Sequence, residues 1–264
     1  MKFEYKITLV ISVYKNISFL DLVLKSVARQ SFKDFEVIIA EDNDADEMTS
    51  FVQQAKEKYW FDIKHVSQPD EGFLKDKILN EATKVSSGEL LVFIDGDCVL
   101  HPKFLYEYSK NMAKNTCLFG KRVLLGKEFT KSISNSGDVK KITTLNLYLN
   151  KNRKREEGIY IPFMHSSRKK GIKGCNFGLP KELLIAVNGF DEDFTEPWGG
   201  EDWDIERRLR LFGADFLCMK NKAIQYHLYH PKVSRGDTAA TRAFFDSREH
   251  FSHEYFCKNG LTKK

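Results

Sequence analysis

The sequence predicts a single α/β domain with a mostly parallel central sheet flanked by helices. Short β-branched apolar runs alternate with segments of helical length and periodicity through the first 110 or so residues, a pattern typical of right-handed βαβ units. Two of the apolar runs end abruptly in clusters of acids. The 264 residues, 42% of them hydrophobic, are enough to form a sizeable core.

The first strands and helices follow from composition and spacing. Residues 7–13 are β-branched and apolar, which predicts a buried strand. A helix follows, with Ser18 as its expected N-cap and apolar residues at helical spacing: Leu20, Leu22, Val23, Leu24 and Val27. Residues 35–40 predict a second strand, which runs into the acids Glu41, Asp42 and Asp44.

The next units repeat this order. Residues 51–59 predict a helix, 63–66 a short third strand and 74–85 another helix. Residues 91–94 form a fully apolar run, which predicts a strand that is buried on both faces. Pro102 is expected to open the helix that comes next.

The fourth strand ends in Asp95-Gly96-Asp97. Open α/β sheets bind ligands at the carboxyl ends of their strands, so both acid clusters are expected on one edge. Carboxylates this close repel each other unless a cation lies between them, and hard oxygen ligands suit Mg²⁺ or Mn²⁺. The alternative is a polar turn, because Asp-Gly is a common turn dipeptide.

The segment 126–173 shows no clear periodicity and is polar and basic. We interpret it as a mobile loop near an acceptor, which separates the half formed by residues 1–125 from the half formed by 174–264. Its basic residues suggest either a solvated surface or a patch that attracts an anionic membrane or a phosphorylated acceptor.

In the second half, residues 174–180 predict a strand that enters a helix at 181–187. Another helix is expected to begin near Glu201 and Asp202, with Ile205, Leu209 and Phe212 as its buried stripe. Acids in a first helical turn are stabilised in their ionised form by the helix dipole, as a general base requires. Trp198 could supply a flat apolar face for a sugar ring. The alternative is helix capping by Glu201 and Asp202, with Trp198 and Trp203 in the core.

Two histidines, His227 and His230, follow a short strand. Either one suits an additional nitrogen ligand for a cation held by Asp97, and Mn²⁺ accepts such a ligand better than Mg²⁺. His227 is the preferred candidate. The alternative is ordinary polar surface.

Other features limit the function. No apolar run is long enough to cross a bilayer and the start lacks a signal-peptide core, so we expect a soluble cytoplasmic protein. The five cysteines form no close pair in sequence. A net charge of +5 does not by itself indicate a nucleic-acid binder, and no nucleic-acid partner is expected. Neither a dinucleotide fingerprint nor a P-loop is present.

Taken in order, the motifs resemble those of GT-A glycosyltransferases of family 2. The second half is similar to the C-terminal module of β-galactosyltransferases and of bacterial chondroitin polymerase. The segments that carry the resemblance span nearly the whole chain: Ile11–Asn16, Gln30–Ile39, Glu41–Asp44, Asp70–Phe73 with Asn80, Phe93–Asp97, Gly189–Glu192 and Trp198–Asp202.

The resemblance implies a UDP-sugar donor, Mn²⁺ or Mg²⁺, inversion at the anomeric carbon, and a saccharide or lipid-linked saccharide acceptor in bacterial surface-glycan synthesis. For the donor, it implies that Val13 and Tyr14 line the nucleotide pocket, that Asp42 hydrogen-bonds the uracil, and that Lys77 lies near the uracil or the phosphates. It implies that Asp95, beside Gly96, contacts the ribose or the metal, and that Asp97 and His227 bind the metal. On the acceptor side, it implies that Asp202 is the general base and that the acceptor is held by Glu201, Trp198 and Gly200.

The chain departs from the family pattern at Glu41, often Asp in the family, and at Lys77 and Leu79, in a segment where arginine is frequent. The basic segments suggest peripheral docking to the inner membrane face.

Competing interpretations remain open from the sequence. A sugar-phosphate nucleotidyltransferase also uses a metal at a sheet edge, but it usually needs a glycine-rich basic loop that Tyr14–Ser18 does not provide. A hydrolase with paired carboxylates is another candidate. The non-enzymatic alternative is a polyanion- or glycan-binding module built on the basic segment.

Overall fold

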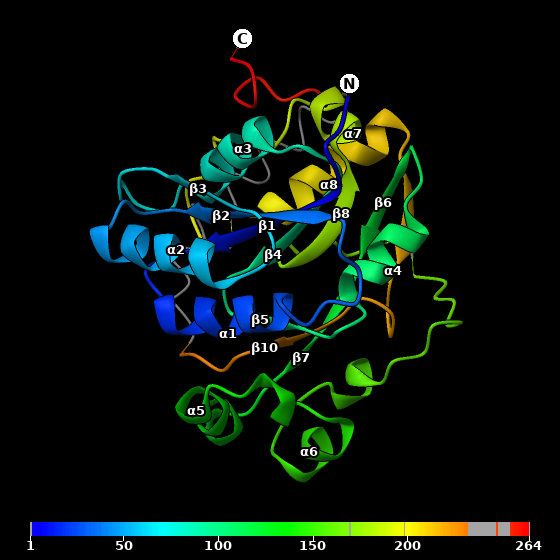
Figure 1. Cartoon of the computed structure of the whole chain (residues 1–264). Coiled ribbons are helices and arrows are strands. Elements are labelled where there is room, and N and C mark those ends of the chain that lie inside the picture. The colour runs from blue at the N-terminus through cyan, green and yellow to red at the C-terminus, as the bar shows by residue number, and fades with distance from the viewer. Residues whose placement is uncertain (1, 169, 198, 232–246, 248–253, 264) are drawn as a thin grey trace.

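The computed structural model describes residues 2–168, 170–197, 199–231, 247 and 254–263. Its main sheet has seven strands in the order β3-β2-β1-β4-β8-β6-β9, with helices on both faces (Figure 1). The strands β1 to β4 are mutually parallel, and β8 is antiparallel to both its neighbours. The prediction of a mostly parallel α/β sheet is therefore confirmed. The sheet strands are β1 (Tyr5–Val13), β2 (Phe35–Glu41), β3 (Ile63–Ser67), β4 (Gly88–Asp95), β6 (Thr116–Phe119), β8 (Asn176–Pro180) and β9 (Asp215–Cys218).

The register of the parallel strands brings the two acid clusters together. Ser12 on β1 lies beside Asp95 on β4, and Val13 lies beside Glu41 on β2. Both clusters therefore leave the sheet at the same edge, as the sequence indicated.

Side chains alternate across β1, so the sheet has an apolar core on each face. Leu9 and Ile11 face one core, which is covered by α1 (Ile17–Val27), α2 (Asp46–Lys58) and α4 (Phe104–Asn111). Val10 faces the other, covered by α3 (Lys75–Val85), α7 (Lys181–Ala186) and α8 (Glu201–Phe212). Burial of the sheet on both faces explains the continuous apolar runs in the sequence.

A smaller sheet packs beside α1 and has the order β5-β10-β7. Its strands are β5 (Cys98–Leu100), β7 (Lys121–Leu124) and β10 (Ile224–His227). The strand β10 pairs with β5 and β7, although it begins 100 positions after the end of β7 in the sequence. The second half therefore completes a sheet that the first half begins.

The prediction of an irregular loop is wrong for much of segment 126–173. The structure has α5 (Lys127–Ser136), α6 (Thr144–Leu149) and two short 3₁₀ turns, Val139–Lys141 and Arg155–Gly158. A few widely spaced apolar residues, among them Phe129, Ile133 and Leu147, pack against β7 and β10 to form a third core. Each of these two helices buries only a few apolar side chains, so the sequence of segment 126–173 shows no clear helical period.

Helix boundaries differ in detail from the predictions. Asn16, not Ser18, caps α1 and accepts a hydrogen bond from the amide of Phe19 at 3.1 Å. The helix expected at Pro102 begins at Phe104. In α8 the predicted stripe is only partly buried, since Phe212 is 38% exposed. Arg208 is buried instead, and its guanidinium donates to Asp204 and to the carbonyls of Val187 and Gly189.

None of the helices that the structure describes is long and apolar enough to cross a membrane.

Candidate functional site

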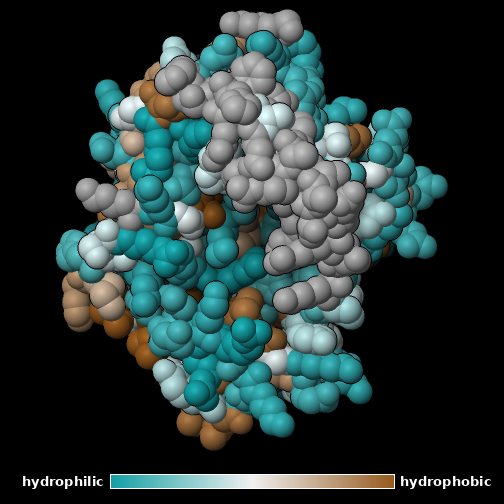
Figure 2. Space-filling model, turned by 180° about the vertical axis from the view of Figure 1, so that it is seen from behind, coloured by the Kyte–Doolittle hydropathy of each residue, from teal (hydrophilic) through white to brown (hydrophobic). Residues whose placement is uncertain are grey.

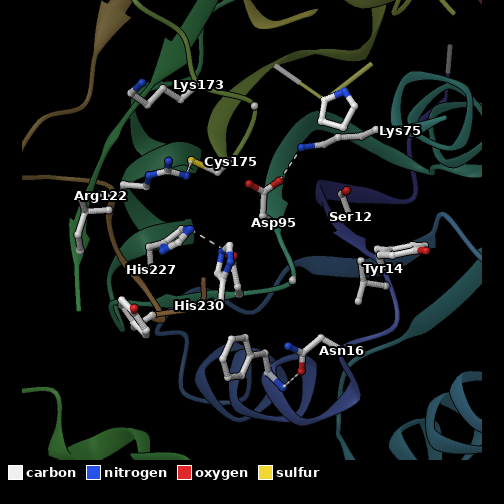
Figure 3. A pocket seen from close by; sticks show the side chains of 18 of the residues that line it. Ser12, Tyr14, Asn16, Lys75, Asp95, Arg122, Lys173, Cys175, His227 and His230 are labelled. Carbon is white, nitrogen blue, oxygen red and sulfur yellow. Dashed lines mark hydrogen bonds and ion pairs between the residues drawn. The ribbon is translucent and has the colours of Figure 1, made fainter. Parts of the chain in front are cut away.

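A cavity of about 1180 Å³ opens at the carboxyl edge of the parallel strands. Residues from both halves of the chain line it (Figure 3). The structure brings most of the predicted site residues together on its walls: Val13, Tyr14, Asp42, Asp95, Gly96, Asp97, Glu201, Asp202, His227 and the alternative candidate His230. Asp97 and Asp202 therefore share one cleft. Trp198 lies outside the described residues, and the individual roles stay predictions.

At one end of the cavity, Asp42 is buried and tightly held. Its Oδ1 accepts from the side-chain amide of Gln68 at 2.6 Å, and its Oδ2 accepts from the backbone amide of Leu74 at 3.0 Å. Each carboxylate oxygen has a second lone pair. Asp42 is thus fixed in place and retains acceptor capacity toward the cavity, beside the half-exposed ring of Tyr14.

The lysine in the cavity is Lys75, not Lys77. Lys75 is the first residue of α3, and its Nζ lies 2.7 Å from Oδ1 of Asp95. Two residues further along a helix the side chain points about 200° away, which is why Lys77 is not among the residues that line the cavity. Burial lowers the pKa of Lys75, but the carboxylates of Asp95, Asp202 and Glu201 raise it more, so the ammonium stays charged.

The glycine of the Asp-Gly-Asp motif is required by close packing. The amide of Gly96 donates to the carbonyl of Ser12 at 2.7 Å, and a Cβ at this position would lie 3.1 Å from the Cβ of Val13. The turn therefore presses against β1 and directs the acids on either side into the cavity.

Asp97 and both histidines form one cluster. Oδ2 of Asp97 lies 3.2 Å from Nε2 of His227 and 3.0 Å from Nε2 of His230, and one ligand atom from each residue lies within 4.8 Å of the others. The sequence left the two histidines as alternatives, and the structure places both beside Asp97. One carboxylate and two imidazoles fit a transition metal such as Mn²⁺ better than Mg²⁺.

The two neighbouring histidines favour the ionised form of Asp97, which is the form that binds a cation. Burial opposes ionisation of Asp97, but the hydrogen bond from His230 and the neighbouring His227 hold its pKa below the usual value. The hydrogen bond to Asp97 raises the pKa of His230, whereas burial lowers that of His227. A neutral imidazole is the form that binds a metal.

Asp202 lies in the first turn of α8, on the wall shared with Lys75. Burial and the adjacent Glu201 raise its pKa to about 7. The expectation that the helix dipole keeps this acid ionised at neutral pH therefore holds only in part, because desolvation and a like charge outweigh a dipole worth about 0.3–1 kcal/mol. A pKa near 7 is suited to a general base.

Glycines shape the surroundings of Asp202. Gly200 precedes α8 with φ of 97°, a left-handed conformation that favours glycine, and it is not among the cavity residues. Gly174 lies directly against the acid, since a Cβ there would come within 2.5 Å of Oδ1 of Asp202. A side chain at position 174 would therefore displace the carboxylate of Asp202.

Four charged or thiol-bearing cavity residues were not singled out from the sequence: Lys75, Arg122, Lys127 and Cys175. The basic segment, in which the sequence suggested a patch for a phosphorylated acceptor, supplies Lys151, Arg153 and Lys173. Lys75 is at the start of a helix that the sequence predicts, so a correct helical register would have indicated Lys75 rather than Lys77. Arg122 and Lys127 come from segments whose sequences showed no periodic signal. Cys175 lies in the segment predicted as a strand, but nothing in the sequence indicated that it would line the cavity.

Comparison with known proteins places the chain in a family. A model described as glycosyl transferase family 2 matches residues 8–173, and one described as the N-terminal domain of galactosyltransferase matches residues 161–231. The chain belongs to glycosyl transferase family 2. A chondroitin synthase of Escherichia coli is 24% identical over 254 residues, covering 89% of this chain and 36% of that protein. The chain spans between a quarter and about half of the length of the curated relatives it matches.

Solved structures confirm the GT-A fold. The mannosyltransferase PcManGT from Pyrobaculum calidifontis, in complex with GDP-Man and Mn²⁺, superposes with a TM-score of 0.62 at 16% identity, covering 94% of this chain and 65% of that one. A TarS fragment from S. aureus in complex with UDP-GlcNAc gives 0.59 at 16% identity, covering 86% and 60%. The resemblance noted in the sequence to family 2 and to a galactosyltransferase module is thus confirmed.

We predict that Mn²⁺ binding depends on both histidines. His227→Ala and His230→Ala should each weaken it by roughly one to two orders of magnitude, because each variant removes one of three protein ligands. Isothermal titration with MnCl₂ measures the effect, with His165→Ala as the control because that exposed histidine lies outside the cavity. Wild-type affinity in either cavity variant would exclude that histidine as a ligand.

Proposed function

We propose that this chain is a metal-dependent inverting glycosyltransferase that moves a sugar from a UDP-sugar to a hydroxyl of a saccharide acceptor. The observation that carries the proposal is the single cavity in which a candidate nucleotide pocket, a candidate metal site and a buried carboxylate with a pKa near 7 meet. Membership of a glycosyltransferase family disfavours the nucleotidyltransferase, the hydrolase and the non-enzymatic module.

The donor end of the cavity suits a nucleotide. Tyr14 offers a ring face for stacking, and the fixed carboxylate of Asp42 suits the N–H edge of uracil. Asp95, held by Lys75, lies between this end and the Asp97 cluster and is suited to the ribose hydroxyls. A solved relative in fold carries UDP-GlcNAc, which supports the choice of UDP.

Asp97, His227 and His230 would hold Mn²⁺ or Mg²⁺, which offsets the charge that develops on a diphosphate leaving group. Mn²⁺ is present in the complex of the similar mannosyltransferase. The two imidazole ligands favour Mn²⁺ for this chain.

The reaction needs one base and no enzyme nucleophile. Asp202 accepts the proton of the acceptor hydroxyl while the hydroxyl oxygen attacks the anomeric carbon and the bond to the diphosphate breaks on the opposite side. A single displacement of this kind inverts the configuration. The carboxylates of Asp95 and Asp202 both raise the pKa of Lys75. The lysine therefore interacts with the donor end and with the acceptor end of the cavity and holds the two carboxylates in a fixed relation. Glu201 and Trp198 are proposed to hold the acceptor sugar.

The remaining wall of the cavity suits a phosphorylated acceptor. Lys151 and Arg153 lie on either side of the buried Asn152, whose side chain accepts from the amide of Gly126 at 2.8 Å and donates to the carbonyl of Leu147 at 3.1 Å. The backbone of Arg153 also pairs with Leu124 through two hydrogen bonds. In this extended segment alternate side chains share a direction, so Lys151 and Arg153 both line the cavity.

The lobe formed by residues 126–173 also has an outer surface, which suits an anionic membrane. Leu145 and Leu149 on α6 are 68% and 72% exposed, and the exposed basic residues Lys140 and Lys154 flank this helix in the chain. Hydrophobic residues gather at the lower end of the molecule in Figure 2, the end that α6 occupies in Figure 1. Apolar side chains surrounded by cations bind anionic lipid surfaces. We therefore propose a cytoplasmic protein that docks peripherally on the inner membrane, where lipid-linked saccharides for surface glycans are extended.

We predict that Asp202→Asn lowers UDP release from UDP-sugars by about 10²–10⁴-fold, the usual contribution of a general base. The amide keeps the shape of the carboxylate, so binding of UDP with Mn²⁺ should change little in calorimetry. Asp215→Asn, which alters an exposed acid on β9, is the control. An Asp202→Asn enzyme with most of its turnover intact would exclude Asp202 as the base.

We predict that kcat/KM for UDP release rises with pH through about 7, as Asp202 loses its proton. Glu201→Gln should move the midpoint to lower pH, because the Glu201 charge raises the pKa of Asp202. Glu89→Gln, on the exposed side of β4 and paired with Lys6, should leave the midpoint unchanged. A midpoint that stays in place in Glu201→Gln, or moves to higher pH, would contradict the assignment.

We predict that the protein cosediments with phosphatidylglycerol vesicles and much less with phosphatidylcholine vesicles. The double variant Leu145→Ser/Leu149→Ser should reduce partitioning by about tenfold or more, because burial of each leucine contributes up to about 1.5–3 kcal/mol. The control is Val85→Ser/Leu211→Ser, which alters two exposed aliphatic residues on α3 and α8. Equal losses in both double variants would refute a docking surface on α6.

A further inference from the structure

Two cysteines that are distant in sequence meet at the floor of the cavity. Cys98 begins β5 directly after Asp97, and Cys175 precedes β8. Their Sγ atoms and a carboxylate oxygen of Asp95 all lie within 4.8 Å of one another. Both thiols are free. Both side chains are buried, with Cys98 0% and Cys175 2% exposed, but Cys175 is among the residues that line the cavity, where Figure 3 shows it beside Arg122.

The charges around this pair disfavour a second metal ion. Nη1 of Arg122 donates to Sγ of Cys175 at 3.0 Å, and Nζ of Lys75 lies 2.7 Å from Asp95. Arg122 and Lys75 already place two positive charges beside the sulfur and carboxylate atoms that would bind a metal, and like charges at such distances repel. The same cations stabilise an anionic sulfur.

Cys175 is therefore the nucleophilic member of the pair. The hydrogen bond with Cys98 lowers the pKa of the Cys175 thiol, burial opposes this, and Arg122 adds to the lowering. A cysteine that has a lowered pKa, lies on a cavity wall and has a second thiol within reach has the features of an oxidation site.

We propose that Cys98 and Cys175 form a peroxide-sensitive dithiol whose oxidation to a disulfide reversibly disables the adjoining metal site. The effect on metal binding rests on the proposed role of Asp97, whereas the disulfide itself does not. The oxidant is a hydroperoxide, and reversal requires a thiol reductant.

The chemistry balances in two steps. The Cys175 thiolate sulfur attacks one oxygen of hydrogen peroxide, the O–O bond breaks, and hydroxide leaves to give a sulfenic acid. The Cys98 sulfur then attacks the Cys175 sulfur, the S–O bond breaks, and water leaves with the Cys98 proton. The hydroxide takes up the proton that Cys175 had given up. Two thiols lose two electrons, and one peroxide becomes two waters.

The disulfide would alter both sides of the site. Sγ of Cys98 donates to Oδ1 of Asp97 at 3.1 Å, and a disulfide sulfur has no proton to donate. Arg122 would lose its favourable charge interaction with the Cys175 thiol and keep only Asp95 and Asp97 as neighbouring acids. The neighbouring Gly174 has no free space toward Asp202, so a shift of Cys175 in that direction would displace the carboxylate.

The test is titration of the reduced chain with hydrogen peroxide. Peptide mapping by mass spectrometry should find a Cys98–Cys175 cross-link, with the loss of two hydrogen atoms. Affinity for Mn²⁺, measured by calorimetry with the metal alone, should fall about 10–100-fold, as expected when a partner of a metal ligand is lost. Dithiothreitol should restore it.

Matched variants separate this pair from the other thiols. Cys175→Ser should form no cross-link and keep its own Mn²⁺ affinity after peroxide. Cys257→Ser, whose hydroxyl can replace the thiol that faces the carbonyls of Val187 and Asn188, should respond as the wild type does. Circular dichroism before oxidation checks that each variant is folded.

The outcomes are distinct. Failure to form the Cys98–Cys175 cross-link overturns the proposal, and so does a cross-link that leaves Mn²⁺ affinity unchanged or a reduced protein that binds no Mn²⁺. A reduced protein that binds Mn²⁺ but releases no UDP from any UDP-sugar would refute the proposed function alone, because both readouts of the dithiol remain measurable.

Discussion

The concentration of carboxylates in one cavity is the constraint on which the rest of the site depends. Five acids line it among the described residues: Asp42, Asp95, Asp97, Glu201 and Asp202. Without compensation their mutual repulsion and desolvation would oppose folding. Three of them have close partners. Amide donors hold Asp42, an ammonium holds Asp95, and two imidazoles face Asp97. At Asp202, burial and the charge of Glu201 outweigh the opposing effect of Lys75, so the pKa is raised.

Buried amides fix the relative position of the two halves that supply these acids. Asn176 on β8 accepts from the hydroxyl of Tyr108 and donates to the carbonyls of Lys121 and Ala223, which ties β8 to both β7 and the approach to β10. Asn80 on α3 bonds both backbone groups of Phe190. Because such groups are costly to leave unpaired when buried, these contacts specify one arrangement of Asp97 against Asp202.

The parallel half of the fold and its acid-rich edge were predictable, because strands buried on both faces show as apolar runs and acids at their ends need no tertiary information. The second sheet was not, since β5 and β7 are short and pair with a strand from the other half. The position of Asp202 was predictable, but its ionisation was not, because burial and the charge of Glu201 depend on packing. Lys75 was missed by two residues of helical register, and the meeting of Cys98 with Cys175 by the 77 positions that separate them in sequence.

The lobe that the sequence did not resolve links the proposed acceptor to the proposed membrane surface. One extended segment, tied to Leu124 and Gly126, directs Lys151 and Arg153 into the cavity, while α6 immediately before it exposes Leu145 and Leu149 to solvent. A lipid-linked saccharide anchored beside Leu145 and Leu149 would place its phosphates near Lys151 and Arg153 while its sugars extend toward Asp202. Because Asn152 bonds both to Gly126 and to the last turn of α6, the two surfaces cannot move independently. The distance from the membrane to the base would then be set by the lobe, and the length of acceptor that fits would follow from it.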